Sequence, residues 1–418
     1  MKKRGTVTVA GVAVAVASLM VTSVPAEAAA GANMRVGIML PLTGDLGTYG
    51  PSLANAAQLG VKMVNDSIKK NKLKGSCTVA GTEDDQTKPS VGVEAATKLV
   101  KSNKSNAIVG SMASSITLAV ANSVTIPNNI ILLPPTASSP AITTLKDKDT
   151  VFRVYPSDNL QGKALALLAA KAFGKTAKIN LGHRNDAFGN GLAEVFTETW
   201  KDNGGTVNKE VKWEPEAASY DSEAQALAGG SPDGWVIIDF DGTFAKIAPA
   251  LSRTGTWKSN KSLMTEGFNS EGAIKNVGAQ YMEGVRGTSG AQDGASPAEF
   301  QAMFTKAYPK AKWNGFEGSA FDSAVLACLA SVNQGSVRAR DLAEGLRNVS
   351  GAEGGVKYTW KQMDAAVKAA ASGKKITYFG AWSAAKFDGA GDPAAGVFDV
   401  YSVASGKPVI NAADRIKF

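Results

Sequence analysis

Short apolar segments alternate with amphipathic segments along most of this chain, and this alternation limits the fold more than any other feature. Apolar runs such as RVGIML (35–40), AIVGS (107–111) and GWVIIDF (234–240) have the length of buried strands. The segments between such runs carry apolar residues at helical spacing, as in 53–68 and 160–173. Apolar strands that alternate with helices are typical of a parallel sheet covered on both faces. The sequence therefore predicts an α/β fold.

The alternation occurs twice, which predicts two domains. It restarts after VFRVYPSD (151–158), so we expect a boundary near residues 150–156. A second crossover between the domains is expected in EGVRGTSG (283–290), and the tail at 378–403 is expected to form one or two strands joined by a turn. A chain of 418 residues is long enough for two such units with well-buried cores.

The N-terminus has the features of a secretory signal peptide. A charged segment at residues 2–4 precedes an apolar run at residues 6–24, and a small-x-small cleavage motif ends at Ala28. A transmembrane anchor is the alternative, but no stop-transfer flank follows the apolar run. We therefore expect residues 1–28 to be removed and the mature chain to be exported, to the periplasm or the exterior of the cell envelope.

The composition argues against several classes of function. The formal net charge is +8, but the lysines are scattered and no basic stripe is interleaved with aromatic residues, which argues against nucleic-acid binding. His183 is the single histidine, so a nucleophile–histidine–acid triad or a cysteine–histidine metal site has few partners to draw on. No phosphate loop, dinucleotide fingerprint or His-Glu-x-x-His motif is present. The sequence predicts a binding protein, not an enzyme, with no cofactor and no metal.

The two cysteines are Cys77 and Cys328. Export would place them in a compartment where disulfides form, so a long-range bridge is one interpretation. Two buried, inert thiols are the other.

Two clusters of hydroxyl side chains follow neighbouring predicted strands. GSMASS (110–115), with Ser114 and Ser115, follows AIVGS, and PTASSP (135–140) follows IILLP (130–134). Open parallel sheets bind ligands at the carboxyl ends of their strands. Serine and threonine at these positions either cap the next helix or place hydroxyl and backbone N–H donors around an anionic group. Either role suits each cluster.

A set of motifs in a fixed order carries a family resemblance. The motifs are PLTGDLGTYGPSLANAAQLGVKMVN, EDDQTKPSVGVEAATKLV, GSMASS, PPTASSPAIT, VFRVYPSDNLQG, FGNGLAEVF and LMTEGF. Together they resemble the type I periplasmic binding proteins, and more closely the branch with the leucine/isoleucine/valine-binding protein. The resemblance covers almost the whole chain after residue 28. It implies two Rossmann-like α/β lobes joined by a three-strand hinge, with lobe 1 at 34–154 plus 287–375 and lobe 2 at 155–286 plus 376–410.

The resemblance also implies a function. Members of this family capture a ligand, usually an amino acid, between closing lobes and deliver it to the permease of an ABC importer. We therefore expect a monomeric substrate-binding protein for a small amino acid. The alternatives are the same fold tuned to an amide, urea or a small carboxylate, and a ligand-sensing module for a signalling partner. A secreted enzyme on this fold is a more remote alternative.

In amino-acid-binding members of the family, the hydroxyl clusters of the first lobe hold the ligand's carboxylate. The matching positions here are Ser114 and Ser138, with backbone groups near Thr136 and Ala137. The neighbouring Ser115 is included in the predicted site.

Four further positions complete the predicted site. Tyr49 matches an aromatic lining position, and Glu266 matches the acid that pairs with the ligand's ammonium group. Phe188 stands where the family often has tyrosine, so its ring can face an ammonium but offers no hydroxyl. The family's usual aromatic stretch is replaced by Asp239-Phe240-Asp241. Asp241 is expected either to support a polar group of the ligand or to cap the helix that follows.

Overall fold

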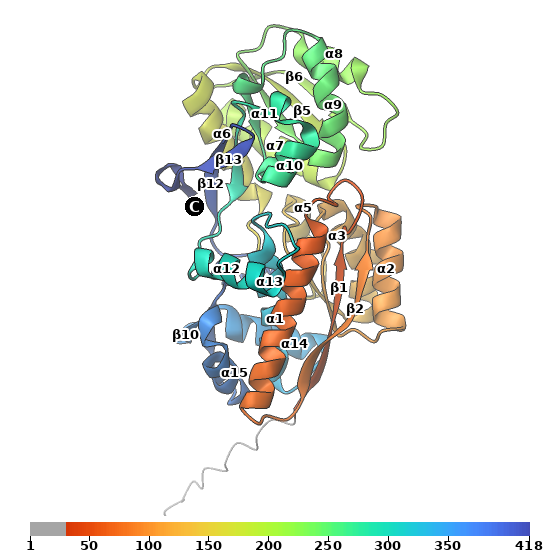
Figure 1. Ribbon diagram of the computed structural model, residues 1–418, viewed down its shortest axis with the longest axis vertical. Coiled ribbons are helices and arrows are strands. Elements are labelled where there is room, and N and C mark those ends of the chain that lie inside the picture. The colour runs from red at the N-terminus through yellow and green to blue at the C-terminus, as the bar shows by residue number, and fades with distance from the viewer. Residues whose placement is uncertain (1–30) are drawn as a thin grey trace, which may run out of the picture.

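The computed structural model describes residues 31–418, and the predicted signal peptide at 1–28 lies outside this range. The described chain forms two α/β lobes, one above the other in Figure 1. Residues near the N-terminus of the described chain belong to the lower lobe, and the chain ends beside the upper one. Within residues 31–418, no helix is long and apolar enough to cross a membrane.

The first lobe is built on a sheet of four parallel strands. Their order is β2 (Ser76–Asp84), β1 (Asn33–Leu40), β3 (Ala107–Val109) and β4 (Ile131–Leu133). Because the connections through α1 (Gly50–Lys70) and α2 (Pro89–Lys101) run in opposite directions across the sheet, right-handed crossovers place these helices on opposite faces. Helix α13 (Glu317–Gln334) packs along α1. With both faces covered, β3 and β4 are wholly buried, which explains their continuous apolar sequences.

Shorter elements complete the first lobe. They are α3 (Ser114–Val120), α4 (Ile126–Asn128), α5 (Pro140–Thr143), α12 (Pro297–Ala307), α14 (Ala339–Ser350), α15 (Met363–Ala371) and the parallel pair β10 (Val356–Thr359) and β11 (Ile376–Phe379).

The second lobe is built on an eight-stranded sheet. Its order is β13 (Lys407–Ile410), β12 (Val397–Ala404), β9 (Arg286–Gly290), β8 (Ser262–Met264), β7 (Gly234–Ile238), β5 (Lys178–Arg184) and β6 (Thr206–Trp213), with β14 (Ile416–Lys417) also paired to β12. The helices are α6 (Asp158–Phe173), α7 (Ala187–Asp202), α8 (Asp221–Ala228), α9 (Asp241–Arg253), α10 (Glu271–Val277) and α11 (Ala279–Met282). Central β7 is fully buried, whereas the edge strand β6 alternates between exposed and partly buried residues until its buried last residue, Trp213.

The segment expected to cross between the lobes at 283–290 contains a strand instead. Strand β9 pairs with β8 on one side and with β12 on the other. Glycine and small polar residues do not favour strands, but bulky aromatic rings lie against this one. A Cβ at Gly287 would lie 2.5 Å from the Tyr401 ring, and a Cβ at Gly290 would lie 2.6 Å from the Tyr155 ring. Glycine is therefore needed where these rings approach the backbone, and the crossover follows β9.

The chain passes between the two sheets three times: after β4, after β9 and before β12. The division of the chain into lobes stays a prediction, and the strand pairing leads us to propose two changes to it. We place β9 in the second lobe, with the boundary near residue 290. We place β11 in the first lobe because it pairs with β10 and because Tyr378 donates to Asp322 of α13. The third boundary then lies near residue 396.

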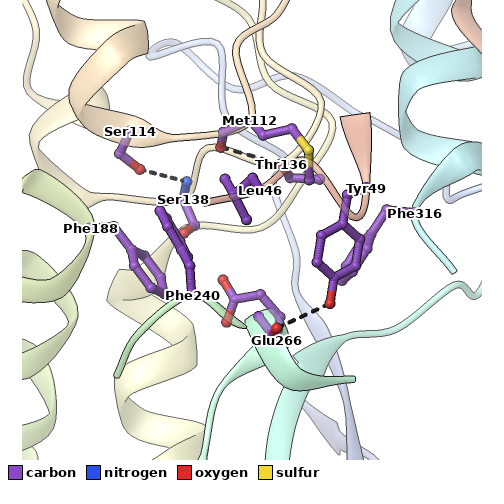
Figure 2. A pocket seen from close by; sticks show the side chains of 11 residues that line it. Leu46, Tyr49, Met112, Ser114, Thr136, Ser138, Phe188, Phe240, Glu266 and Phe316 are labelled. Atoms are coloured by element: carbon purple, nitrogen blue, oxygen red, sulfur yellow. Dashed lines mark hydrogen bonds between the residues drawn. The ribbon is translucent and has the colours of Figure 1, made fainter. Parts of the chain in front are cut away.

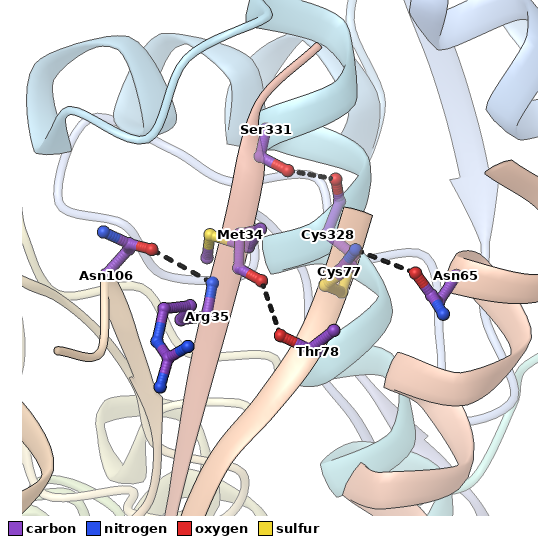
Figure 3. Close-up of a disulfide and its surroundings, with 8 residues drawn as sticks. All are labelled: Met34, Arg35, Asn65, Cys77, Thr78, Asn106, Cys328 and Ser331. Atoms are coloured by element: carbon purple, nitrogen blue, oxygen red, sulfur yellow. Dashed lines mark hydrogen bonds between the residues drawn. A yellow bond between two sulfur atoms is a disulfide. The ribbon is translucent and has the colours of Figure 1, made fainter. Parts of the chain in front are cut away.

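The two cysteines form a disulfide inside the first lobe (Figure 3). Cys77 lies on β2 and Cys328 on α13, with their Cα atoms 5.8 Å apart. Both side chains are buried, and the two positions are 251 residues apart in the sequence. The bond therefore joins the N-terminal part of this lobe to the part that follows the second lobe.

Removing the disulfide should lower the stability of the folded protein. In the Cys77→Ala/Cys328→Ala variant we expect the free energy of unfolding to fall by about 2–5 kcal/mol, because the unfolded chain regains the freedom that the long covalent loop removes. Urea titrations followed by circular dichroism would measure the difference. The parent under reducing conditions should approach the variant, and equal stability of variant and oxidised parent would contradict the expectation.

Candidate functional site

A cavity lies between the two lobes, at the carboxyl ends of strands from both sheets (Figure 2). The centre of a water-sized sphere can occupy about 30 Å³ of this cavity, so the cavity is narrow in this state of the protein. The first lobe contributes Leu46, Tyr49, Met112, Ser114, Thr136, Ser138 and Phe316, and the second contributes Phe188, Phe240, Glu266 and Gly267.

Most of the residues predicted for the site line this cavity. They are Tyr49, Ser114, Thr136, Ser138, Phe188 and Glu266. Ser115, Ala137 and Asp241 do not line it. Asp241 begins α9, where its carboxylate accepts hydrogen bonds from Thr48 at 2.8 Å and Asn276 at 2.9 Å. Asp241 therefore joins the two lobes beside the cavity.

One wall of the cavity is aromatic and apolar. The rings of Phe188 and Phe240 stack with their centroids 5.2 Å apart. The guanidinium of Arg184 lies 3.8 Å from the centroid of Phe240, and the carboxylates of Asp186 and Asp239 bind this guanidinium. Phe240 is thus fixed by contacts with both Phe188 and Arg184. Leu46, Met112 and Phe316 add further apolar surface, which suits an apolar group of a ligand.

Five of the lining residues were not predicted from the sequence, namely Leu46, Met112, Phe240, Gly267 and Phe316. Four of them lie inside the quoted motifs or next to predicted residues, so their positions carried a signal. Phe316 lies far from every motif in the sequence, and only the fold brings it against Tyr49, with ring centroids 5.6 Å apart.

Three of the four hydroxyl groups that line the cavity donate their hydrogen to other protein groups. Tyr49 donates to the Gly267 carbonyl at 3.0 Å, Thr136 to the Met112 carbonyl at 3.3 Å and Ser138 to Asp158 Oδ2 at 2.9 Å. Ser114 differs, because its Oγ accepts the backbone N–H groups of Ser138 at 3.2 Å and Ser139 at 3.1 Å. The Ser114 hydroxyl hydrogen is therefore available to a ligand.

Glu266 supplies the ionisable group of the cavity. It follows β8, and its carboxylate accepts a hydrogen bond from the side-chain amide of Gln161. Burial raises the pKa of Glu266 to about 7, although hydrogen bonds from its backbone and from Gln161 lower it. Among residues 31–418, no lysine, arginine or histidine side chain forms an ion pair with Glu266. A cationic group of a ligand would fill this role.

A second buried acid lies close to Glu266. Burial, and secondly the charge of Glu266, raise the pKa of Asp158 well above its ordinary value. Asp158 Oδ1 is buried and has no hydrogen-bond partner among the described residues. This end of the cleft therefore holds two buried carboxyl groups whose pKa values are both raised.

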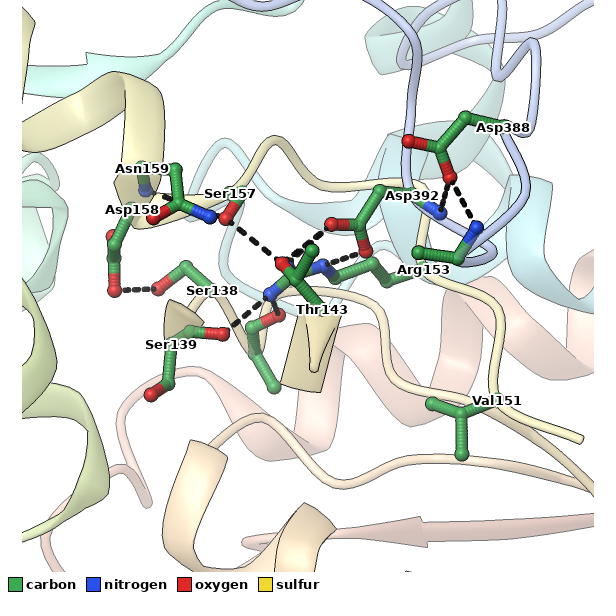
Figure 4. A network of polar contacts seen from close by, with 12 residues as sticks. Ser138, Ser139, Thr143, Val151, Arg153, Ser157, Asp158, Asn159, Asp388 and Asp392 are labelled. Atoms are coloured by element: carbon green, nitrogen blue, oxygen red, sulfur yellow. Dashed lines mark hydrogen bonds and ion pairs between the residues drawn. The ribbon is translucent and has the colours of Figure 1, made fainter. Parts of the chain in front are cut away.

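A buried arginine holds the loop that carries Thr136 and Ser138 (Figure 4). Arg153 donates to the carbonyl oxygens of Ala137 at 3.3 Å and Ser139 at 3.0 Å. Its guanidinium also makes a two-point contact with Asp392, at 2.6 and 2.8 Å. Arg153 belongs to the first crossover and Asp392 to the third, so one ion pair fixes both crossovers and the backbone beside the cavity.

The lobes also contact each other directly at the mouth of the cleft. Thr243 donates to Asp45 at 2.6 Å, and the Asp45 carbonyl accepts the N–H of Gly242 at 3.3 Å. With the contacts of Thr48 and Tyr49 described above, these bonds hold the loop after β1 against the second lobe. The structure is therefore in a closed state.

Clusters that would hold a metal are absent from the described part of the chain. The acidic pair at the end of β2, Asp84 and Asp85, instead supports neighbouring loops. Asp84 accepts from Thr43, and Asp85 accepts from Ser111 at 2.6 Å and from the Thr87 backbone at 2.9 Å.

Two lobes with a cavity between them are also found in known proteins that this chain resembles. Residues 33–367 match the family described as periplasmic binding protein. The chain belongs to this family. Periplasmic binding proteins of this kind are ligand carriers, not enzymes, and the leucine/isoleucine/valine-binding branch is the one that this chain resembles.

Curated relatives within the family include a Leu/Ile/Val-binding protein, BraC3, of Rhizobium johnstonii, 31% identical over 43% of this chain and 47% of its own length. The chain spans about half the length of such relatives. A substrate-binding protein of a chemotactic signal transduction system from Halobacterium salinarum is 24% identical over 88% of this chain and 86% of its own.

Solved structures of this periplasmic binding protein fold align along nearly the whole chain. A leucine-binding protein from Thermotoga maritima has a TM-score of 0.72 at 19% identity and covers 91% of this chain and 98% of its own. A branched-chain amino acid binding protein from Streptococcus pneumoniae, in complex with isoleucine, has a TM-score of 0.71 at 19% identity, with coverages of 92% and 100%. These structures establish the fold.

Replacing Glu266 should change how the stability of the ligand-free protein depends on pH. A carboxyl whose pKa rises on folding binds more protons in the folded state, so stability falls as pH rises between its ordinary value of 4.5 and about 7. Glu266→Gln cannot titrate. We therefore expect the variant to gain stability relative to the parent as pH rises from about 5 to about 8.

Thermal unfolding of both proteins across this pH range would measure the difference. Glu271→Gln is the control, because Glu271 is exposed on α10 of the same lobe. A difference between the Glu266 variant and the parent that is the same at every pH would show that Glu266 does not titrate in this window.

Proposed function

We propose that this protein is the exported substrate-binding component of an ABC importer and that it captures a small α-amino acid with an apolar side chain. The observation that carries the proposal is the polarity of the cavity. Glu266, buried without a cationic partner, lies in the second lobe, and Ser114, with an uncommitted hydroxyl hydrogen, lies in the first. A zwitterion would bind both groups at once, while its side chain contacts Phe188, Phe240 and Phe316.

This arrangement would couple binding to closure. Because the two polar groups belong to different lobes, a ligand that binds both stabilises the closed state over the open state. The direct bonds between the lobes, such as that of Thr243 to Asp45, are formed in the same state. The ligand and these bonds would then stabilise closure together.

Two observations support the remaining parts of the proposal. The disulfide is typical of a compartment outside the cytoplasm, which agrees with the predicted signal peptide. The relatives named as Leu/Ile/Val-binding proteins support an amino acid as ligand. The permease is proposed as partner from the family resemblance alone. A monomer in solution remains part of the proposal.

A sensory role is the second candidate, because one relative that aligns along most of the chain serves a chemotactic signal transduction system. The cavity would bind the same ligand in that role. A thermal-shift screen of the twenty common amino acids, with urea, acetamide and benzoate, tests the ligand class common to both roles. Stabilisation by urea, acetamide or benzoate but by no amino acid would contradict the proposal.

Glu266→Gln should weaken binding of L-leucine by about 2–5 kcal/mol, because the ligand's buried ammonium loses its charged partner. The deaminated analogue, 4-methylpentanoate, should be affected much less, since it has no ammonium. Isothermal titration calorimetry of parent and variant with both ligands would measure the effect. Equal affinity of parent and variant for L-leucine would remove Glu266 from the binding site.

Ser114→Ala should weaken both ligands by about 1–3 kcal/mol, because both carry the carboxylate that accepts the Ser114 hydroxyl hydrogen. Ser123→Ala is the control, since Ser123 is an exposed serine shortly after α3. If the Ser114 variant binds both ligands as tightly as the parent, Ser114 only fixes the backbone of Ser138 and Ser139.

A further inference from the structure

A third carboxylate lies beside the Arg184 guanidinium, and it comes from the other lobe. Arg184 ends β5 of the second lobe, where its Nε donates to Asp186 at 2.6 Å and its Nη1 to Asp239 at 3.2 Å. Asp45 belongs to the loop after β1 of the first lobe, and its Oδ2 lies 3.7 Å from the same Nη1. Among residues 31–418, no other lysine or arginine forms an ion pair with any of these aspartates, so one positive charge faces three negative charges.

The second lobe neutralises Arg184 without help from the first. Asp186 also caps the start of α7 with its carboxylate. Asp239 is completely buried, and its Oδ2 accepts the indole N–H of Trp213 at 3.0 Å. All these partners belong to the second lobe, so we expect the two aspartates to stay bound to Arg184 when the lobes separate. Asp45 therefore brings its charge to a guanidinium that is already neutralised.

In the closed state, Asp45 lies tightly against the start of α9. Its Oδ2, the oxygen that lies nearest Arg184, also accepts the Thr243 hydroxyl at 2.6 Å. A Cβ at Gly242 would lie 2.6 Å from the Asp45 Cα, so the two backbones leave no space for a side chain between them. These contacts hold the Asp45 carboxylate beside Arg184 and its two aspartates for as long as the cleft is closed.

We propose that this contact makes closure of the cleft depend on pH: closure brings Asp45 to a cation that is already neutralised, and the closed state relieves the excess of negative charge by binding a proton. Opening separates Asp45 from the acids of the second lobe, so the proton is released. The closed state is thus favoured at lower pH. The inference rests on the proposed function, because it requires an amino acid that drives closure.

The pKa values of two acids of the second lobe agree with this proposal. Burial raises the pKa of Asp239 to about 8, and Asp45 and Asp186 add to this rise while Arg184 opposes it. Burial also raises the pKa of Asp241 to about 6; hydrogen bonds oppose this rise and the charge of Asp45 adds to it. Part of each rise comes from the other lobe, so it is lost when the lobes separate.

The sign of the pH dependence follows from the direction of these shifts. An acid whose pKa is higher in the closed state binds more protons there than in the open state. Its contribution to closure is complete below its pKa in the open state and is lost as pH rises through its pKa in the closed state. For Asp239 this upper limit is about 8.

The other charged groups at this contact leave the excess of negative charge in place. Lys88, which precedes α2 in the first lobe, binds Glu216 of the second lobe at 2.8 Å, and Lys246 of α9 also acts on Glu216. Asp84 binds the loop after β1 within the first lobe, so it moves with that loop. Burial raises the pKa of Tyr220, so its phenol stays neutral below its ordinary value of 10.

Asp45→Asn should remove this pH dependence. The amide oxygen of asparagine can still accept the Thr243 hydrogen, so the change removes the charge and keeps the contact. Because the Asp45 side chain is 21% exposed, water screens part of its charge, and we expect a fraction of a proton per ligand. With L-leucine as probe, the ratio of the parent's affinity to the variant's should fall about 3- to 10-fold from about pH 6 to about pH 8, equivalent to about a quarter to a half of a proton.

Isothermal titration calorimetry gives the affinities, and titrations in two buffers of different ionisation enthalpy count the protons. L-leucine stays a zwitterion over this range, and Glu266 and Asp158 are present in both proteins, so the ratio isolates Asp45. Glu94→Gln is the control, because it removes one negative charge from the exposed surface of α2 in the same lobe. Its ratio to the parent should not change with pH.

Asp239→Asn tests where the proton is held. In this background, Asp45→Asn should change the pH dependence much less than it does in the parent, because the acid with the higher pKa is gone. An equal effect of Asp45→Asn in both backgrounds would contradict a proton on Asp239. Should Asp239→Asn lack a cooperative unfolding transition, the comparison of the parent with Asp45→Asn still decides whether closure depends on pH through Asp45.

The outcomes separate this inference from the proposed function. If the parent binds L-leucine and its affinity relative to Asp45→Asn is the same at every pH, Asp45 only attracts Arg184 and accepts from Thr243. The inference is then wrong, while the function stands. A ratio that rises with pH would overturn the inference in the same way. If the parent binds none of the twenty amino acids, the proposed function fails and the inference fails with it.

Discussion

The buried ion pair between Arg153 and Asp392 is the interaction on which the hinge and the binding loop both depend. Taking a guanidinium out of water is costly unless its donors are satisfied, and here they bind one carboxylate, two carbonyl oxygens and the Thr143 hydroxyl. Two of the three crossovers and the loop of Thr136 and Ser138 therefore form one unit. Because Arg153 ties the loop to the crossovers, we expect the loop to keep its shape when the lobes move.

The pairing of buried arginines with aspartates also explains the polarity of the cleft. Arg153 contacts the loop beside the cavity and Arg184 contacts Phe240 of its wall, and both cations are already bound by aspartates. The cavity is left with a buried glutamate and with hydroxyl groups that mostly donate elsewhere. Its interior lacks positive charge and fixed donors. A ligand that brings both an ammonium and a carboxylate supplies the missing groups and leaves with them when the lobes open.

The fold could be predicted from the sequence because its central strands are apolar on both faces and many of its helices are amphipathic, so the local pattern and the tertiary structure agree. Strand β9 was missed because RGTSG carries no strand signal. Its place depends on Tyr155 and Tyr401, which lie far away in the sequence.

Only part of the candidate site could be predicted from the sequence, because some of its residues also depend on contacts that are distant in the sequence. Ser114 and Glu266 stand in recognisable motifs, whereas Phe316 reaches the cavity only through the fold. The hydrogen bond between Ser138 and Asp158 joins residues twenty positions apart, and a sequence pattern does not record such a pairing.

The disulfide between Cys77 and Cys328 has a topological consequence. The segments that form the hinge side of the cleft, from the first crossover to the second, lie inside the covalent ring that this bond closes. A single peptide-bond cleavage anywhere between the two cysteines would open the ring but leave one connected molecule. An exported binding protein, as proposed for this chain, would meet proteases outside the cell. In this chain, a nick in either of the first two crossovers would not release a lobe.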